Sequence, residues 1–397
     1  MKKIKMGMVG GGEGAFIGAV HRIAAFMDGN IELVCGAFSS DPKKSKVSGQ
    51  NLFLPTNRCY DSYQEMFECE SKLPAEEKMD FVSIVTPNHL HFPIAKMAFE
   101  YGFEVLSDKP ATLNLQEALV LKQLINRHDR LYGLTHVYTG YPLVKHAKDL
   151  IKNGELGNIV KVFVEYSQGW LSDKEDESGK QASWRLDPKQ SGISCCIADI
   201  GVHAANLVEY VTGLSMVSLC SDLTSSVVGR TLDDDGTILF KLANGAKGVC
   251  IASQISLGEE NNLVLKVYGD KKSIEWHQQA SNTLLLKSKT EPTKLIRTGV
   301  GEFSNNVTTA MRTPSGHPEG YLEAFANIYQ NFARQIRAKQ ADEPCSNLVF
   351  DVPGIEEAIR GMAFIEQAVQ ASQSSQKWHN FTIQQESTEK ESSDVSN

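Results

Sequence analysis

Three short segments of the chain combine residue types that suit hydride-transfer chemistry. Residues 10–15 (GGGEGA) follow an apolar run, residues 107–110 (SDKP) close another, and residues 199–203 read DIGVH. A glycine-rich turn can hold a dinucleotide pyrophosphate, because backbone N–H groups approach phosphates where no Cβ obstructs them. The other two segments can place a lysine, an aspartate and a histidine around the reactive ring of that nucleotide. Together they predict hydride transfer to or from a substrate that carries a hydroxyl group.

The lysine, aspartate and histidine of these segments supply the groups that alcohol oxidation requires. The reaction needs an acceptor for the hydroxyl proton and a donor or cation beside the oxygen that becomes a carbonyl. Lys109 can hydrogen-bond the hydroxyl, and His203 can accept its proton near neutral pH. If their segment is helical, Asp199 and His203 share one face, so the carboxylate either orients the imidazole or binds a neighbouring substrate hydroxyl. We therefore predict Lys109, Asp199 and His203 as catalytic residues.

The glycine segment has the context that a dinucleotide site requires. It lies between a predicted strand at 4–9 and a predicted helix at 17–27. Gly10, Gly12 and Ala15 fit the G-x-G-x-x-[GA] pattern, and Gly18 is an alternative third position. In an open parallel sheet, ligands bind outside the carboxyl ends of the strands. The predicted cofactor-binding residues are Gly10, Gly12, Ala15, Phe16, Ser39, Ser40, Lys44, Thr86, Pro87, Asn88, His91, Asp108, Lys109 and Pro110.

The residues after the second predicted strand bear on the choice between NAD and NADP. NAD sites usually place an acidic side chain there, which binds the ribose 2′-OH. Here Ser39 and Ser40 occupy the position, Lys43 and Lys44 follow, and Asp41 comes about two residues late. Hydroxyls beside a cation suit a 2′-phosphate, so the sequence favours NADP over NAD. A strand end displaced by two residues would reverse this choice.

The pattern of apolar residues predicts the elements that position these segments. Up to about residue 135, short apolar strands alternate with helical periods, which predicts a parallel sheet covered on both faces. Beyond about residue 138, strand-like segments follow one another with turn signals between them, which predicts one large, mainly antiparallel open sheet. We expect an α/β chain with a dinucleotide-binding domain at 1–137, an α+β substrate-binding and oligomerisation domain at 138–383, and a disordered tail at 384–397.

Composition restricts the class of protein. The 397 residues suit two domains, and 41% hydrophobic with 22% charged residues is typical of a soluble globular protein. A net charge of −8 disfavours nucleic-acid binding by a general basic field. The sequence has neither a membrane-spanning apolar run nor a signal-peptide pattern, so we expect a cytoplasmic protein without a membrane partner. Eight cysteines without ligand-pair spacing predict no disulfides and no metal site.

Residues near the motifs are candidates for substrate contacts. Trp184 and Arg185 precede the DIGVH segment by a short stretch, and an indole face beside a guanidinium suits a hydroxylated ring or an anionic substituent. A structural pair that anchors the loop is the alternative. His317 precedes the predicted helix at 321–339 and is a weaker candidate, because helix capping explains much of its segment. The polar segment 172–183 is either a lid or a plain surface loop.

In their order and spacing, the glycine segment, residues 86–91 (TPNHLH), 108–110 (DKP) and 199–203 (DIGVH) resemble the Gfo/Idh/MocA oxidoreductase family. The resemblance covers about residues 4–380. It implies an N-terminal Rossmann domain and a C-terminal α/β domain whose open sheet often forms dimer or tetramer contacts. It also implies NAD(P)-dependent oxidation or reduction of a sugar, cyclitol or related polyol. We therefore expect a small polyol or sugar as substrate and a homodimer or homotetramer.

The resemblance implies the same catalytic lysine, aspartate and histidine, but three features depart from the family pattern. Residues 18–21 (GAVH) come about three residues later than the family's Gly-x-x-His, and Asp108 replaces the more common glutamate. Tyr138 begins a segment (YTGYP) that lacks the arginine many members carry there. We retain Tyr138 as a predicted substrate contact, and the missing arginine leaves the substrate class open.

Two other functions are compatible with the same residues. A redox-neutral, NAD(P)-dependent glycoside hydrolase would oxidise its substrate transiently, eliminate the glycosidic bond and regenerate the cofactor. A non-catalytic sensor would bind the dinucleotide alone, since a fold does not by itself establish chemistry. The retained Lys109 and His203 argue against the sensor.

Overall fold

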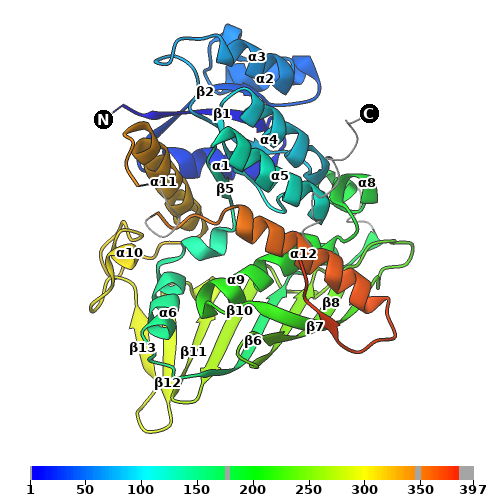
Figure 1. Cartoon of the computed structure of the whole chain (residues 1–397), viewed down its shortest axis with the longest axis vertical. Coiled ribbons are helices and arrows are strands. Elements are labelled where there is room, and N and C mark those ends of the chain that lie inside the picture. The colour runs from blue at the N-terminus through cyan, green and yellow to red at the C-terminus, as the bar shows by residue number, and fades with distance from the viewer. Residues whose placement is uncertain (1, 175–178, 345–349, 384–397) are drawn as a thin grey trace, which may run out of the picture.

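The computed structural model describes residues 2–174, 179–344 and 350–383, and within these ranges the chain forms two sheets with helices between them (Figure 1). The predicted disordered tail at 384–397 lies outside the described residues, as does part of the candidate lid, residues 175–178. No helix in the described ranges is both long enough and apolar enough to cross a membrane.

The first sheet has five parallel strands in the order β2-β1-β3-β4-β5, as the alternation of strands and helices predicts. The central strands β3 and β4 are fully buried, because helices cover both faces of the sheet. The strands are β1 (Ile4–Gly10), β2 (Ile31–Ala37), β3 (Phe81–Val85), β4 (Glu104–Ser107) and β5 (Tyr132–Leu134). Their connecting helices are α1 (Phe16–Phe26), α2 (Pro42–Asn51), α3 (Tyr63–Ser71), α4 (His91–Glu100) and α5 (Leu115–His128).

A helix from the C-terminal part of the chain packs with the helices that cover the first sheet. Helix α11 (Tyr321–Gln340) packs beside α1. The Tyr329 hydroxyl lies 2.7 Å from Nδ1 of His21 and 2.8 Å from Oγ of Ser83 on β3, and the Phe332 ring packs edge-on against Phe81. This part of the core therefore depends on residues that are far apart in sequence. The domain boundary at 137/138 stays a prediction.

The second sheet has nine strands in the order β13-β12-β11-β10-β6-β9-β8-β7-β14. Its described pairs are antiparallel except for β6 with β9, so the prediction of a mainly antiparallel sheet is confirmed. The strands are β6 (Ile159–Ser167), β7 (Met216–Thr224), β8 (Asp235–Leu242), β9 (Lys247–Ser253), β10 (Asn262–Gly269), β11 (Lys272–His277), β12 (Thr283–Ser288), β13 (Lys294–Arg297) and β14 (His379–Asn380).

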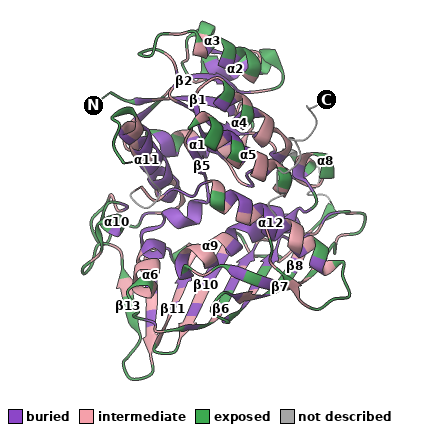
Figure 2. Cartoon of the chain, viewed as in Figure 1, coloured by how far each residue is buried: buried purple, intermediate pink, exposed green. Residues whose placement is uncertain are grey.

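Helices cover one face of this sheet and leave the other open. Helices α6 (Pro142–Lys152), α9 (Val202–Thr212) and α12 (Ile355–Ser372) lie between the two sheets (Figure 1). Buried positions alternate with intermediate or exposed positions along β6, β8 and β9 (Figure 2). The second sheet therefore has one face that helices cover and one face that is open.

Candidate functional site

A cavity of about 1490 Å³ opens at the carboxyl ends of the first-sheet strands and extends to the inner face of the second sheet. Its size suits a dinucleotide together with a small substrate. The predicted residues that line it are Gly10, Gly12, Ala15, Phe16, Ser39, Ser40, Lys44, Thr86, Pro87, Asn88, Asp108, Lys109, Tyr138, Trp184, Arg185, Asp199 and His203. His91, Pro110 and His317 are not among the lining residues.

The glycine turn forms a cradle that any side chain would fill. Gly10 and Gly11 have positive φ angles of 84° and 69°, which favour glycine. A Cβ on Gly12 would lie 2.7 Å from the carbonyl oxygen of Phe38. Helix α1 starts at Phe16, and no side chain caps its N-terminus, so its first N–H groups remain available to a phosphate. These residues fit a bound dinucleotide.

The third glycine of the pattern is Gly18 and not Ala15. A Cβ on Gly18 would lie 2.3 Å from the Cα of Gly11, so the helix can pack against the turn only with glycine at this position. Ala15 is instead the residue that precedes the helix, with an extended backbone. The turn is longer than in the standard pattern, so the glycine that lets the helix pack closely against the turn comes three residues later, at Gly18.

The end of the second strand carries hydroxyls and a lysine toward the cavity. Strand β2 ends at Ala37, and Ser39, Ser40 and Lys44 line the cavity beyond it. The Asp41 carboxylate accepts the backbone N–H groups of Lys43 and Lys44 at 2.9 and 3.3 Å and so caps α2. Asp41 therefore serves as a helix cap and is not among the residues that line the cavity.

His91 supports the cofactor end from behind and does not contact the cavity, contrary to the prediction. The side chain is buried; Nδ1 lies 2.7 Å from the carbonyl oxygen of Pro110, and Nε2 lies 2.8 Å from that of Thr86. The ring therefore ties together the loops that leave β3 and β4. Asn88 Nδ2 donates to the carbonyl of Ser191 at 3.1 Å and joins the same loop to the second part of the chain.

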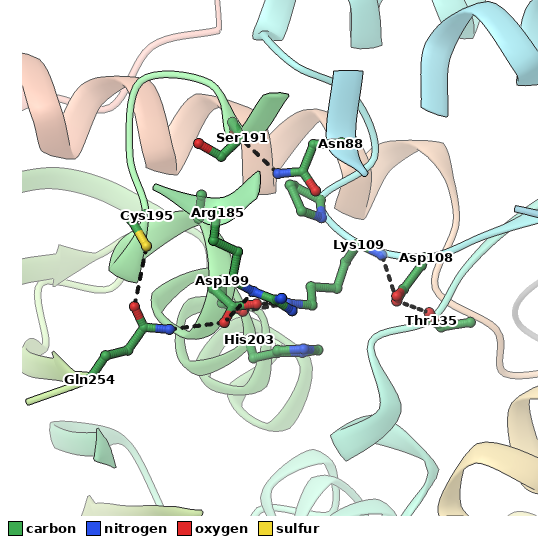
Figure 3. A network of polar contacts seen from close by, with 12 residues as sticks. Asn88, Asp108, Lys109, Thr135, Arg185, Ser191, Cys195, Asp199, His203 and Gln254 are labelled. Atoms are coloured by element: carbon green, nitrogen blue, oxygen red, sulfur yellow. Dashed lines mark hydrogen bonds and ion pairs between the residues drawn. The ribbon is translucent and has the colours of Figure 1, made fainter. Parts of the chain in front are cut away.

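Lys109 and Asp199 meet at the far end of the cavity (Figure 3). The Lys109 ammonium donates to Oδ1 of Asp199 at 2.8 Å and to its main-chain carbonyl at 2.6 Å. On Oδ2, Arg185 Nε approaches to 3.1 Å and Gln254 Nε2 donates at 2.9 Å. Burial alone would raise the pKa of Asp199, but the charges of Arg185 and Lys109 outweigh it and hold that pKa well below its usual range.

The turn that carries Asp199 is a π-helical segment, Ile197–Gly201, which leads directly into α9. The Asp233 carboxylate accepts the backbone N–H groups of Cys195 and Ile197 at 3.0 and 2.9 Å and so fixes the start of the turn. Within the described ranges the Asp199 carboxylate makes no hydrogen bond to His203. It therefore does not orient the imidazole directly, whereas its contact with a substrate hydroxyl stays a prediction, because Oδ1 has a single side-chain donor among the described residues and can accept a further hydrogen bond.

His203 lines the cavity among aromatic side chains. Its ring lies 5.0 Å from the ring of Tyr138 in an edge-on arrangement, and its Nδ1 lies 3.4 Å from Nδ1 of His136. Burial lowers the pKa of His203 well below its usual value, the nearby Lys109 lowers it further, and Asp199 opposes them. The imidazole is therefore neutral at physiological pH and able to accept a proton.

The predicted substrate contacts divide into three that reach the cavity and one that does not. Trp184 and Arg185 belong to α7 (Lys180–Arg185), and the guanidinium lies 4.3 Å from the centre of the Trp184 ring. The Tyr138 hydroxyl lies within hydrogen-bond distance of the hydroxyl of Tyr166 and accepts from Asn261 Nδ2 at 3.2 Å. His317 is exposed and outside the cavity lining, because its segment turns away before α11 begins.

Several cavity residues were missed by reasoning from sequence. Tyr166 and Asn261 line the substrate end, and Gln254 supports Asp199 from behind. Tyr166 follows Val162 and Val164 in the inward-pointing alternation of β6, which was a usable signal. Gln254 gave no signal, because its place follows from the pairing of β9 with distant strands.

Two family models match the chain. The model described as "Oxidoreductase family, NAD-binding Rossmann fold" matches residues 4–136, and "GFO/IDH/MocA C-terminal domain" matches residues 144–275. The uncharacterized oxidoreductase YfiI of Bacillus subtilis (strain 168) is 32% identical over 386 aligned residues, with 96% of this chain and 97% of that protein covered.

Solved structures agree with these matches. The inositol dehydrogenase homolog from Azotobacter vinelandii, complexed with NADH and myo-inositol, superimposes with a TM-score of 0.90 at 30% identity and covers 96% of this chain and 98% of that one. An oxidoreductase from Sinorhizobium meliloti is 41% identical with a TM-score of 0.85, and 96% and 100% of the two chains are covered.

Proposed function

The chain belongs to the Gfo/Idh/MocA oxidoreductase family, and we propose that it oxidises a hydroxyl, or reduces the corresponding carbonyl, of a sugar, cyclitol or related polyol with NAD(P)(H). One observation carries this proposal. Lys109, Asp199 and His203 line the same cavity as the glycine turn, although they come from three distant segments. The myo-inositol in the A. vinelandii structure supports cyclitols as the first substrates to test.

Different residues of the cavity have different roles in such a reaction. The bound nicotinamide supplies the acceptor or donor of hydride. Lys109 places a cation beside the reacting oxygen, and Asp199 holds that ammonium in position at 2.8 Å. His203, neutral because it is buried, takes up the hydroxyl proton in oxidation and returns it in reduction. Trp184 and Arg185 offer a flat apolar face and a guanidinium to a hydroxylated ring.

For the cofactor, we propose a preference for NADP over NAD. The support is the group at the end of β2, where Ser39, Ser40 and Lys44 line the cavity and Asp41 caps a helix. Hydroxyls and an ammonium suit a 2′-phosphate, whereas a ribose 2′-OH is usually held by a carboxylate.

For the assembly, we propose that the open face of the second sheet packs against a second copy in a homodimer or homotetramer. Phe163 on β6, Val249 on β9 and Leu239 on β8 pair across neighbouring strands and form an outward-facing apolar row. Phe163 and Leu239 are 42% and 38% exposed, and Ile251 nearby is 36% exposed. A contiguous apolar patch of this kind marks an association surface. We also propose a cytoplasmic location, which suits the free cysteines among the described residues.

The test begins with cofactor binding. Thermal-shift measurements with NAD(H) and NADP(H) identify the nucleotide, and a panel of cyclitols and sugars with that nucleotide identifies the substrate. We expect steady NAD(P)H formation with at least one polyol. Release of an aglycone without net reduction would instead support the glycoside hydrolase. Nucleotide binding with no turnover of either kind across the panel would support the sensor.

A further inference from the structure

His136 lies directly behind His203, on the side away from the cavity. It follows β5, is 1% exposed and does not line the cavity, whereas His203 does. The two Nδ1 atoms are 3.4 Å apart, and the rings stand nearly perpendicular at 81°. The only nitrogen of His203 that this contact leaves for the cavity is Nε2.

A contact between two Nδ1 atoms couples the tautomers of the two rings. A neutral imidazole carries one N–H, so one ring must donate and the other must accept. If His203 donates from Nδ1, its Nε2 is bare and can accept a proton from a substrate hydroxyl. If His136 donates, Nε2 of His203 carries the hydrogen and can only donate. The direction of this single bond therefore decides which task His203 can perform.

We infer that His136 is a positioning residue that accepts a hydrogen bond from Nδ1 of His203 and so keeps Nε2 of His203 unprotonated for the substrate hydroxyl. This inference rests on the proposed function, because it assigns the bond a part in the oxidation of an alcohol. The usual partner for such a catalytic histidine is a carboxylate. Here Asp199, four residues before His203, accepts hydrogen bonds from Lys109 and Gln254 and forms an ion pair with Arg185.

The second nitrogen of His136 indicates that this residue is retained for more than packing. Nε2 of His136 is buried and has no hydrogen-bond partner within the described part of the chain. No neighbouring group there holds His136 in one tautomer, so His136 can adopt whichever form its bond to His203 requires. In either tautomer this polar atom is buried without a partner among the described residues, a cost that an apolar residue at the same position would avoid.

The proton balance of the oxidation follows from this arrangement. The substrate hydroxyl gives its proton to Nε2 of His203, and the hydride from the same carbon goes to NAD(P)+, so the alcohol becomes a carbonyl. The imidazolium that forms keeps its Nδ1–H on His136. Reduction runs the same proton transfer in reverse.

Charged and titratable groups around the histidine pair are few and belong to the same site. Lys109 lowers the pKa of both rings, Asp199 acts on His203 and Asp108 on His136 in the opposite sense. The phenol rings of Tyr138 and Tyr166 pack against His203. Burial is the largest influence and lowers the pKa of His136 to about 3, so both rings are neutral across the working pH range and the bond persists there.

The first experiment measures the tautomer of His203 directly. In protein labelled with ¹⁵N at histidine and free of nucleotide and substrate, we expect the His203 signals of an Nδ1–H imidazole; H203N identifies them by their loss. The variant H136N places an amide atom near the position of Nδ1 and should keep this tautomer. The variant H136L removes the acceptor and should move His203 toward the Nε2–H form. An unchanged His203 tautomer in H136L would overturn the inference.

Kinetics with the substrate found above give the second readout. H136L should lower kcat for oxidation on the order of tenfold to a hundredfold while KM and nucleotide affinity change little, and H136N should recover most of the loss. Equal losses in both variants, with matching falls in Tm, would show a packing role and also overturn the inference. If wild-type protein oxidises no polyol, the proposed function fails, while the tautomer measurement still decides the role of His136.

Discussion

The Lys109 ammonium lies 2.8 Å from Oδ1 of Asp199, and this contact joins the two halves of the molecule at the reacting end of the cavity. Lys109 leaves β4 of the first sheet, and Asp199 lies on the π-helical turn above the second sheet. Neither half contains the site alone. The packing of the two sheets therefore sets the position of the cation that faces the substrate.

Replacing Lys109 with alanine should lower kcat by a factor on the order of 10² to 10³, because the cation beside the reacting oxygen is lost. Steady-state kinetics with the identified substrate measure this effect. Lys122→Ala is the matched control, since Lys122 pairs with the exposed Glu356 and does not line the cavity. Full activity of the Lys109 variant would remove the lysine from the mechanism.

The depressed pKa of Asp199 makes part of the folding stability depend on pH. Its folded-state pKa lies below the unfolded value of about 3.9, so the ionised carboxylate stabilises the fold above that pH and loses this effect as the pH falls. The free energy of unfolding of wild type relative to Asp199→Asn should therefore be greatest near pH 6 and shrink toward pH 3. Urea unfolding at pH 6, 4 and 3 measures the difference. A difference that grows on acidification would contradict the assigned charge.

Replacing Gly18 with alanine should damage the cradle. The added Cβ would lie 2.3 Å from the Cα of Gly11, so helix and turn must separate. We expect a loss of about 1–3 kcal/mol in the free energy of unfolding and weaker nucleotide binding. Ala19→Ser, at the exposed neighbouring position, is the control and should change neither quantity. Calorimetry with and without nucleotide separates the two effects, and unchanged binding in Gly18→Ala would refute the role of this contact.

The sequence pattern predicted the strands and helices whose formation depends mainly on their own residues. The bounds of β1 and α11 agree within one residue with the predicted segments 4–9 and 321–339, because apolar runs and helical periods are properties of the segment itself. Helix α2 was not predicted, since its single large apolar residue, Val47, gives no helical period. Strand β12 was also missed, although Leu284 and Leu286 point into the core.

The same distinction holds for the site. Lys109, Asp199 and His203 were predicted because each belongs to a short motif, and the structure brings them to one cavity. Their partners Gln254 and His136 were not predicted, because each acquires its place through contacts between distant segments. The exact bond partners of the catalytic candidates are thus a property of the tertiary structure.

Replacing Lys44 with alanine should weaken NADP binding about tenfold or more while NAD binding stays nearly unchanged, because the 2′-phosphate is the charged group that NADP has and NAD lacks. Titration calorimetry with each nucleotide measures both affinities. Lys43→Ala is a close control, since Lys43 is exposed and does not line the cavity. An equal effect of Lys44→Ala on both nucleotides would place the lysine at another phosphate and remove the support for an NADP preference.

Charging the open face of the second sheet should dissociate the proposed oligomer. Phe163 and Leu239 flank Val249 across the strands, so Leu239→Lys sets an ammonium at one end of the apolar row, directly beside Val249. A buried unpaired charge destabilises an interface by several kcal/mol, enough to shift a micromolar sample toward monomer. Analytical ultracentrifugation measures the mass of each species. Val228→Lys is the control, because Val228 is 86% exposed and lies outside the strands of this sheet. If Leu239→Lys keeps the wild-type mass, or if wild type itself is a monomer, the open sheet face is not the association surface.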